Sequence, residues 1–263
     1  MTEDISTTRV DHEGASTNRR RRGALLFLRD LLVIFVVAVL VSFLIKTFLI
    51  RSFFIPSESM EMTLVKDDRI IVNQLVPGVT PLERGDVVVF KDPGGWLPAR
   101  VEPETPPLAA AVDWFLAFVG LSAPDSNDHL VKRVIGLPGD HVTCCNALGQ
   151  MSVNGVPLDE PYVVLPAGDT KVSRDDFDVV VPDGSLWVMG DNRYNSKDSR
   201  YNGDTPLKGF VPVENVVGRA FVVSWPVSHW AWLGNYPETF AGVEDAAENG
   251  DAAEPDDVVQ GGD

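Results

Sequence analysis

Apolar residues follow two different patterns along the chain. Residues 31–50 form a nearly unbroken apolar run of 20 positions. At about 1.5 Å of rise per residue, a helix of this length spans roughly 30 Å, the thickness of the hydrocarbon core of a bilayer. The run therefore predicts a transmembrane helix over 31–50, preceded by a basic N-terminal segment over 1–30.

After residue 50 the apolar segments are short, rich in Val, Ile and Phe, and separated by Gly, Pro, Asp and Asn. Such segments are typical of strands, and helical periodicity is nearly absent. We therefore predict a mainly β domain with an antiparallel sheet over 51–242. Within it, the pair Asn154-Gly155 predicts a hairpin turn. The clearest candidate strands are 69–73, 86–90, 130–135, 186–189 and 216–223.

A Pro-rich insertion over 93–126 interrupts this pattern. Residues 107–121 contain three consecutive alanines and a Trp-Phe-Leu triplet, which are compatible with one helix. A packed helix or an ordered loop is the simpler interpretation, and contact with a membrane surface is the alternative.

Charge is unevenly distributed over the 263 residues. The chain has 38 acidic and 22 basic side chains, a net charge of −16. Because nucleic-acid phosphates are bound by clustered Lys and Arg, this balance argues against a nucleic-acid partner. Eight of the acids and none of the bases lie in 243–263, a segment rich in Ala, Gly, Asp and Glu. Such a composition does not bury a core, so we predict a disordered acidic tail.

A cleavable signal peptide is the alternative to a permanent anchor. It requires small residues at alternate positions just after the apolar run, and none follow in Ile45–Ile50. We therefore expect the helix to remain. By the positive-inside rule, the four arginines Arg19–Arg22 keep the N-terminus in the cytoplasm. The chain is thus predicted to cross the cytoplasmic membrane once, with the β domain on the extracytoplasmic side.

The two cysteines, Cys144 and Cys145, are adjacent, which does not suit a disulfide framework of the usual kind. His141 stands three residues before the first of them, but a structural metal site needs two more ligands. We therefore expect neither a metal nor a cofactor, and the redox state of the cysteine pair stays open.

Four polar clusters follow the apolar run, and each alone has an ordinary structural explanation. They are 55–64, 84–90, 131–140 and 189–200. In the third cluster Lys132 and Arg133 stand within an apolar strand and point to opposite faces, so one of them must face the interior or a cleft. A buried lysine is costly while it is charged, and it can act as a general base when it is neutral.

In this order the clusters resemble those of bacterial type I signal peptidases, which are membrane-anchored Ser/Lys proteases. The resemblance spans about 51–223. Met62 stands where the family usually has Pro, and Tyr194 where it usually has Asp, so we expect altered loop rigidity or cleft shape there. The matching motifs are Pro56-Ser57-x-Ser59-Met60, Gly85-Asp86-Val87-Val88, Lys132-Arg133-Val134-Ile135-Gly136-Leu137-Pro138-Gly139-Asp140 and Gly190-Asp191-Asn192-Arg193-x-Asn195-Ser196-x-Asp198-Ser199-Arg200.

The resemblance implies a mechanism without histidine, metal or cofactor. Ser59 would be the nucleophile and Lys132 the general base, with the pKa of the lysine lowered by burial in its strand. Ser57 would complete an oxyanion hole with the backbone N–H of Ser59, and Ser196 would orient the lysine amine through a hydrogen bond. Structural roles near the site fall to Arg133, Asp191, Asp198 and Arg200, with Arg133 paired to one of the two aspartates.

The implied substrate is the cleavage region of a secretory preprotein, with small residues at the first and third positions before the cut. An extended peptide of this kind can add to a sheet edge. Membrane lipid is a second expected partner, and contact with the secretion machinery is left open. The candidate pocket-lining residues are Ile55, Pro56, Leu64, Leu130 and Val131, and Trp225, Trp230 and Trp232 fit either an interfacial aromatic surface or the core.

Two alternatives remain at this level. A membrane-anchored extracytoplasmic β module that binds peptides without catalysis explains the anchor and the strands, but not the joint occurrence of Ser59, Lys132 and Ser196. A self-cleaving or regulatory Ser/Lys protease on a related fold acts in the cytosol, and the apolar run argues against it.

Overall fold

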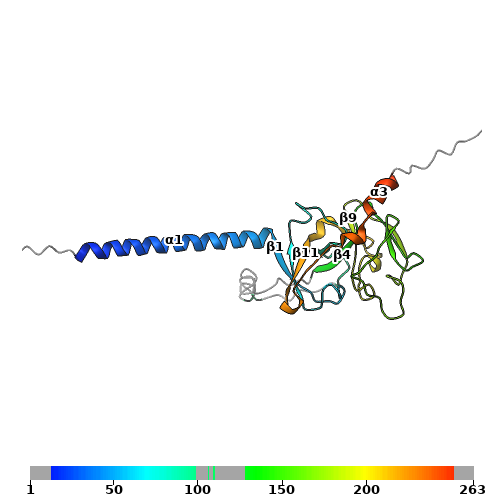
Figure 1. Cartoon of the computed structure of the whole chain (residues 1–263), viewed down its shortest axis with the longest axis horizontal. Helices are drawn as coiled ribbons and strands as arrows, with labels where there is room; N and C mark the ends of the chain where they lie inside the picture. Colours follow the sequence, from blue (N-terminus) through cyan, green and yellow to red (C-terminus); the bar gives the residue numbers. More distant parts are fainter. Residues whose placement is uncertain (1–12, 99–105, 107–108, 110–127, 252–263) are drawn as a thin grey trace, which may run out of the picture. The chain divides into compact units, whose positions relative to one another are not determined.

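The computed structural model describes residues 13–98, 106, 109 and 128–251. The helix predicted within 107–121, like most of the Pro-rich insertion, lies outside the described residues. The chain divides into two units, Met1–Thr47 and Phe48–Asp263, and each is described by itself (Figure 1).

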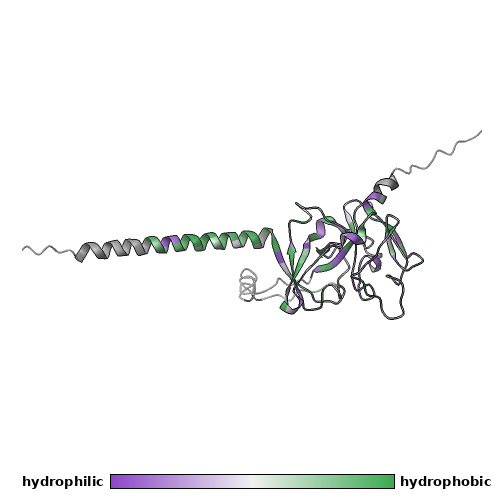
Figure 2. Ribbon diagram, in the orientation of Figure 1, coloured by the Kyte–Doolittle hydropathy of each residue, from purple (hydrophilic) through white to green (hydrophobic). Residues whose placement is uncertain are grey.

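The first unit contains most of helix α1, Glu13–Phe48. Within it, Leu26–Ile45 has a mean hydropathy of 2.6 and none of it is buried, so this helix is long and apolar enough to cross a membrane. Figure 2 shows this stretch as mostly hydrophobic, with one hydrophilic interruption near its start, where the sequence has Arg29 and Asp30. The apolar stretch begins five residues earlier than the predicted run, and the helix ends at Phe48, because Ile50 already pairs in the first strand.

The second unit is built on two antiparallel sheets. In the described residues the larger sheet has eight strands, in the order β1-β2-β11-β3-β4-β9-β10 with β12 paired to β11. The prediction of a mainly antiparallel β domain that follows an apolar helix in the sequence is therefore confirmed. The strands are β1 Ile50–Phe54, β2 Arg69–Asn73, β3 Val87–Lys91, β4 His129–Gly136, β9 Ser185–Met189, β10 Val211–Pro212, β11 Val216–Trp225 and β12 Ala231–Trp232.

The smaller sheet has four strands in the order β7-β6-β5-β8. Its β6–β7 hairpin turns at Asn154-Gly155, where both residues have positive φ, 51° and 79°. This geometry is that of a two-residue hairpin turn, so the predicted turn is confirmed. The strands are β5 His141–Cys144, β6 Met151–Val153, β7 Val156–Pro157 and β8 Phe177–Val180.

Short helices connect and follow the strands. They are the 3-10 helices η1 Ser199–Tyr201, η2 Val213–Asn215, η3 Val227–His229 and η4 Pro237–Phe240, followed by α-helix α3 Val243–Asp251. The first turn of α3 matters for the predicted tail, because Val243 is fully buried in the apolar cluster beneath the smaller sheet. The boundary predicted at Val243 is therefore corrected: residues 243–251 form a helix that starts in the core, and 252–263 lie outside the described residues.

Candidate active site

Ser59 lies in a tight turn segment between β1 and β2. The backbone closes on itself there, with Glu61 N–H donating to Glu58 O and Leu64 N–H to Met60 O. Met60 and Leu64 are buried in the apolar cluster under the larger sheet, and they fix the turn from below. Ser59 itself keeps 8% of its surface exposed. Its hydroxyl therefore sits on a rigid support at the edge of solvent.

Lys132 reaches this hydroxyl from β4, in the middle of the larger sheet. Its Nζ lies 2.6 Å from Ser59 Oγ and 3.1 Å from the carbonyl oxygen of Val131. β4 is hydrogen-bonded on both sides, by β3 and β9. Lys132 is 3% exposed and its neighbour Arg133 is fully buried, so both cations of this strand are buried, on opposite faces.

Burial lowers the pKa of Lys132 from its usual 10.5 to about 8. Loss of solvation is the largest cause, because it disfavours the ammonium form. The carboxylates of Asp198 and Asp191 oppose this shift, and the guanidinium of Arg200 adds to it. A substantial fraction of the lysine is therefore neutral near pH 8 and able to accept a proton.

The other two serines of the predicted site also lie near Ser59. Ser57 Oγ is 3.3 Å from Ser59 Oγ. Ser196 Oγ is buried, and it has no hydrogen-bond partner among the described residues. The implied hydrogen bond from Ser196 to Lys132 is thus not formed here, since the amine contacts Ser59 and the Val131 carbonyl instead.

Gly190 joins these serines through its backbone. A β-carbon at this position would lie 2.3 Å from Ser196 Oγ and 2.4 Å from the carbonyl oxygen of Ser59. The same carbonyl accepts a hydrogen bond of 3.1 Å from the N–H of Asn192. The loop 190–200 therefore packs on the backbone of the serine turn, at a point where only glycine fits.

The four charged residues assigned to structural roles form two buried ion pairs. Arg133 donates to both carboxylate oxygens of Asp191, at 2.8 and 2.6 Å, and neither side chain is exposed. Arg200 likewise donates to both oxygens of Asp198, at 2.9 and 2.8 Å. Asp198 also accepts from the N–H of Gly190 at 3.0 Å. Of the two partners left open for Arg133, Asp191 is the one observed.

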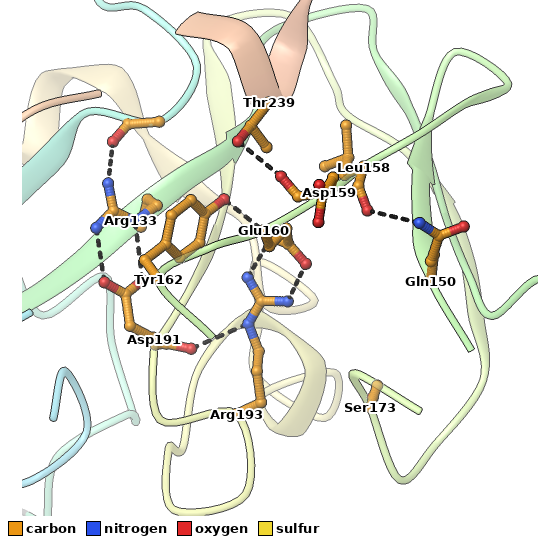
Figure 3. A network of polar contacts seen from close by, with 12 residues as sticks. Arg133, Gln150, Leu158, Asp159, Glu160, Tyr162, Ser173, Asp191, Arg193 and Thr239 are labelled. Atoms are coloured by element: carbon orange, nitrogen blue, oxygen red, sulfur yellow. Dashed lines mark hydrogen bonds and ion pairs between the residues drawn. The ribbon is translucent and has the colours of Figure 1, made fainter. Parts of the chain in front are cut away.

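Three further buried residues join this network, of which only Arg193 belongs to a recognised motif (Figure 3). Glu160 accepts from Arg193 at 2.7 and 2.5 Å and from the hydroxyl of Tyr162 at 2.9 Å. The ring of Tyr162 lies 4.0 Å below the guanidinium of Arg133. Glu160 and Tyr162 carry no periodicity or spacing that marks them in the sequence, so only tertiary packing identifies them.

The candidate pocket-lining residues differ in exposure. Ile55 and Leu64 are buried within the core. Pro56 is exposed, and Leu130 and Val131 are half-buried. The last three therefore have surface that a substrate can meet. The three C-terminal tryptophans, Trp225, Trp230 and Trp232, are 55–67% exposed, so core packing does not explain them.

Both departures from the family motif have local structural consequences. Met62 has φ 88°, a value that the ring of proline does not permit. The turn after Ser59 thus takes a backbone conformation that depends on the absence of proline. Tyr194 donates its hydroxyl to the carbonyl of Lys171 at 2.9 Å, and Arg174 lies 4.7 Å from its ring. Tyr194 therefore ties the loop 190–200 to residues 171–174.

The cysteine pair forms a disulfide between adjacent residues, Cys144 and Cys145. Within the described part of the chain, no group of three His, Cys, Asp or Glu side chains is arranged to hold a metal ion.

Comparison with known proteins identifies the family. The family model of signal peptidase, peptidase S26, matches residues 28–225. The chain belongs to this family. It is 39% identical over 239 residues to the signal peptidase I of Mycobacterium tuberculosis, covering 84% of this chain and 80% of that one. It is 38% identical over 260 residues to a probable signal peptidase I of Mycobacterium leprae, covering 89% and 88%.

The peptidase S26 assignment establishes the general activity of the chain as that of a peptidase. A crystal structure of a signal peptidase I from Enterococcus faecalis is also similar, with 25% identity and a TM-score of 0.35, covering 52% of this chain and 95% of that one.

Proposed function

We propose that this chain is an endopeptidase that removes signal peptides from secretory preproteins by a Ser59–Lys132 dyad. The observation that carries the proposal is the 2.6 Å contact between Lys132 Nζ and Ser59 Oγ, together with the lowered pKa of the buried lysine. A serine hydroxyl is a weak nucleophile until a nearby base takes its proton. A neutral amine at hydrogen-bond distance is such a base.

In the proposed acylation step, neutral Lys132 accepts the proton of Ser59 Oγ while that oxygen attacks the scissile carbonyl carbon. The resulting ammonium then protonates the departing amine. Water attacks the acyl-enzyme next, again with Lys132 as the base, and the serine is regenerated. No histidine takes part in this sequence of proton transfers.

The negatively charged oxygen of the tetrahedral intermediate must be stabilised by hydrogen-bond donors. Ser57 Oγ is 3.3 Å from the nucleophile, which is close enough for its hydroxyl to reach an oxyanion formed there together with the Ser59 N–H. The unpartnered hydroxyl of Ser196 remains available to accept a hydrogen bond from the lysine once it becomes an ammonium.

We further propose that cleavage occurs after small-x-small residues, at the outer face of the cytoplasmic membrane. Helix α1 supplies an apolar span of sufficient length to anchor the chain, with four arginines on its N-terminal side. The exposed tryptophans Trp225, Trp230 and Trp232 suit the bilayer interface, where one part of the ring is apolar and the N–H is hydrated. Membrane lipid is therefore the expected second partner.

The test uses the full chain in detergent with a peptide that contains an Ala-x-Ala cleavage region, read by mass spectrometry. We expect a single cut after the second Ala, and loss of that cut in Ser59→Ala and in Lys132→Ala. Matched controls are Ser224→Ala and Lys171→Ala. The half-buried Ser224 hydroxyl donates to the carbonyl of Arg69, and the exposed Lys171 pairs with Asp176, both outside the proposed dyad. They should cleave at the parental rate.

Two outcomes contradict the proposal. If either dyad variant cleaves as fast as the parent, the catalytic assignment fails. If the folded parent binds the peptide but leaves it and a full-length preprotein in lipid intact, the chain acts as a peptide-binding β module instead.

A further inference from the structure

Glu160 occupies a buried position in the segment that follows β7. The backbone before it is held by two bonds of 2.8 Å, from Leu158 N–H to Met151 O and from the Thr239 hydroxyl to Asp159 O. Its own carbonyl accepts from Val163 N–H at 3.0 Å. Figure 3 shows its carboxylate pointing toward Arg193 and Tyr162. A carboxylate held this rigidly provides a fixed reference point for whatever binds it.

The first group that binds Glu160 is the guanidinium of Arg193, which is fully buried and bidentate. The same guanidinium donates through Nε to the carbonyl oxygen of Gly190 at 3.1 Å. Gly190 is the residue whose backbone touches Ser59 and Ser196. Glu160 is therefore connected to the nucleophile through one arginine and one peptide group.

The second group is the hydroxyl of Tyr162, which donates to Glu160. Burial holds the pKa of Tyr162 well above its usual value, so the hydroxyl keeps its proton. The ring of Tyr162 lies under the guanidinium of Arg133, the residue next to Lys132 on β4. A cation over an aromatic face is attracted to it, so this contact holds the strand that carries the lysine.

The two connections end on opposite partners of the catalytic pair. One reaches the backbone that supports Ser59, and the other reaches the strand that supports Lys132. A displacement of either support changes the distance between Oγ and Nζ, and catalysis is sensitive to errors of this size.

We propose that Glu160 and Tyr162 are positioning residues that act through two buried arginines on the catalytic pair. They do not touch the substrate or the reacting atoms. The smaller sheet and the segment after it thus contribute to the reaction by holding its geometry. This inference rests on the proposed Ser/Lys mechanism.

The test compares the purified full chain with Glu160→Gln, Tyr162→Phe and Tyr162→Leu. Rates are normalised to the folded fraction, measured by near-UV circular dichroism at the assay temperature. The matched control is Val153→Ala. Val153 lies in β6 of the smaller sheet, and its side chain is buried in the apolar cluster outside the network, so the substitution leaves a cavity there. It reports what a loss of stability alone does to the rate.

We expect Glu160→Gln to lower the normalised kcat about 10- to 100-fold while KM changes by less than about twofold. Tyr162→Leu should behave in the same way. Tyr162→Phe keeps the ring under Arg133 and should recover much of the loss. If Glu160→Gln does not fold, the difference between the two Tyr162 variants decides the question.

The proposal is overturned if Glu160→Gln and Tyr162→Leu both retain the normalised kcat of Val153→Ala. It is also overturned if Tyr162→Phe is as slow as Tyr162→Leu. Ser59→Ala is measured in parallel. If that variant still cleaves, the Ser/Lys mechanism itself fails, whereas its inactivity together with a normal Glu160→Gln rate removes only the positioning role.

Discussion

Gly190 packs against Ser196 with no room for a side chain between them, since a β-carbon on Gly190 would come within 2.3 Å of Ser196 Oγ. It would also lie 2.4 Å from the carbonyl oxygen of Ser59, which is backbone and cannot rotate away. The loop and the serine turn are therefore fitted to each other at their closest approach.

This contact predicts that Gly190→Ala is inactive although it folds. The added methyl group must push the serine turn away from the loop, and misplacement of the nucleophile by about 1 Å costs on the order of 100-fold in rate. Peptide cleavage by the full chain in detergent measures the loss, and far-UV circular dichroism checks the fold.

Gly203 provides the control for this substitution. It lies beyond η1 in the same part of the chain, and a β-carbon there has no heavy atom within 4 Å. Gly203→Ala should cleave at the parental rate. Equal rates for Gly190→Ala and the parent would contradict the close packing of the loop on the serine turn.

The lowered pKa of Lys132 predicts how activity depends on pH. Only the neutral amine accepts the serine proton, so kcat/KM should rise with pH up to about 8, the pKa of Lys132, and then level off. The profile is measured with a peptide that has no titrating side chain, and the melting temperature is followed over the same range. A flat profile between pH 6 and 9 in folded enzyme would count against Lys132 as the base.

The same lowered pKa also predicts how the stability of the folded chain depends on pH. The usual pKa of 10.5 is lowered to about 8 on folding, so the unfolded chain binds more protons between these two values. The stability penalty of the buried lysine is therefore complete below pH 8 and disappears as the pH rises to 10.5. A shift of this size corresponds to up to about 3 kcal/mol.

Lys132→Met should accordingly be inactive but more stable than the parent at neutral pH. The gain in the free energy of unfolding should shrink as the pH approaches 10.5, because the parental lysine is then neutral in both states. Urea unfolding at pH 7 and pH 10 gives the difference. A gain that is the same at both pH values would show that lost packing or hydrogen bonding, rather than charge, accounts for it.

Local sequence signals were sufficient for the strands that carry the site. The predicted strand 69–73 coincides with β2, and 130–135 lies within β4. The alternation of Lys132 and Arg133 followed directly from the period of a strand. Their joint burial did not, because it depends on β3 and β9 pairing with both edges of β4.

The features that sequence reasoning missed depend on contacts between distant segments. Glu160 and Arg193 are separated by 33 positions, and nothing in either local sequence marks the other as its partner. Composition places Val243 in the acidic tail, yet this one apolar side chain at the start of the segment is buried in the core. The composition of a segment does not reveal a single apolar residue of this kind, although that one residue is enough to attach the segment to the core.

The buried pair of Arg133 and Asp191 gives a prediction on stability. Both side chains are fully buried, and Asp191→Asn removes the carboxylate that is paired directly with the guanidinium. Removing one partner of a buried pair typically costs about 3–5 kcal/mol, because the remaining charge stays desolvated. Asp176→Asn is the control, since its pair with Lys171 is exposed and worth less than about 1 kcal/mol. Urea unfolding should separate the two variants clearly, and equal midpoints would mean that water reaches Arg133.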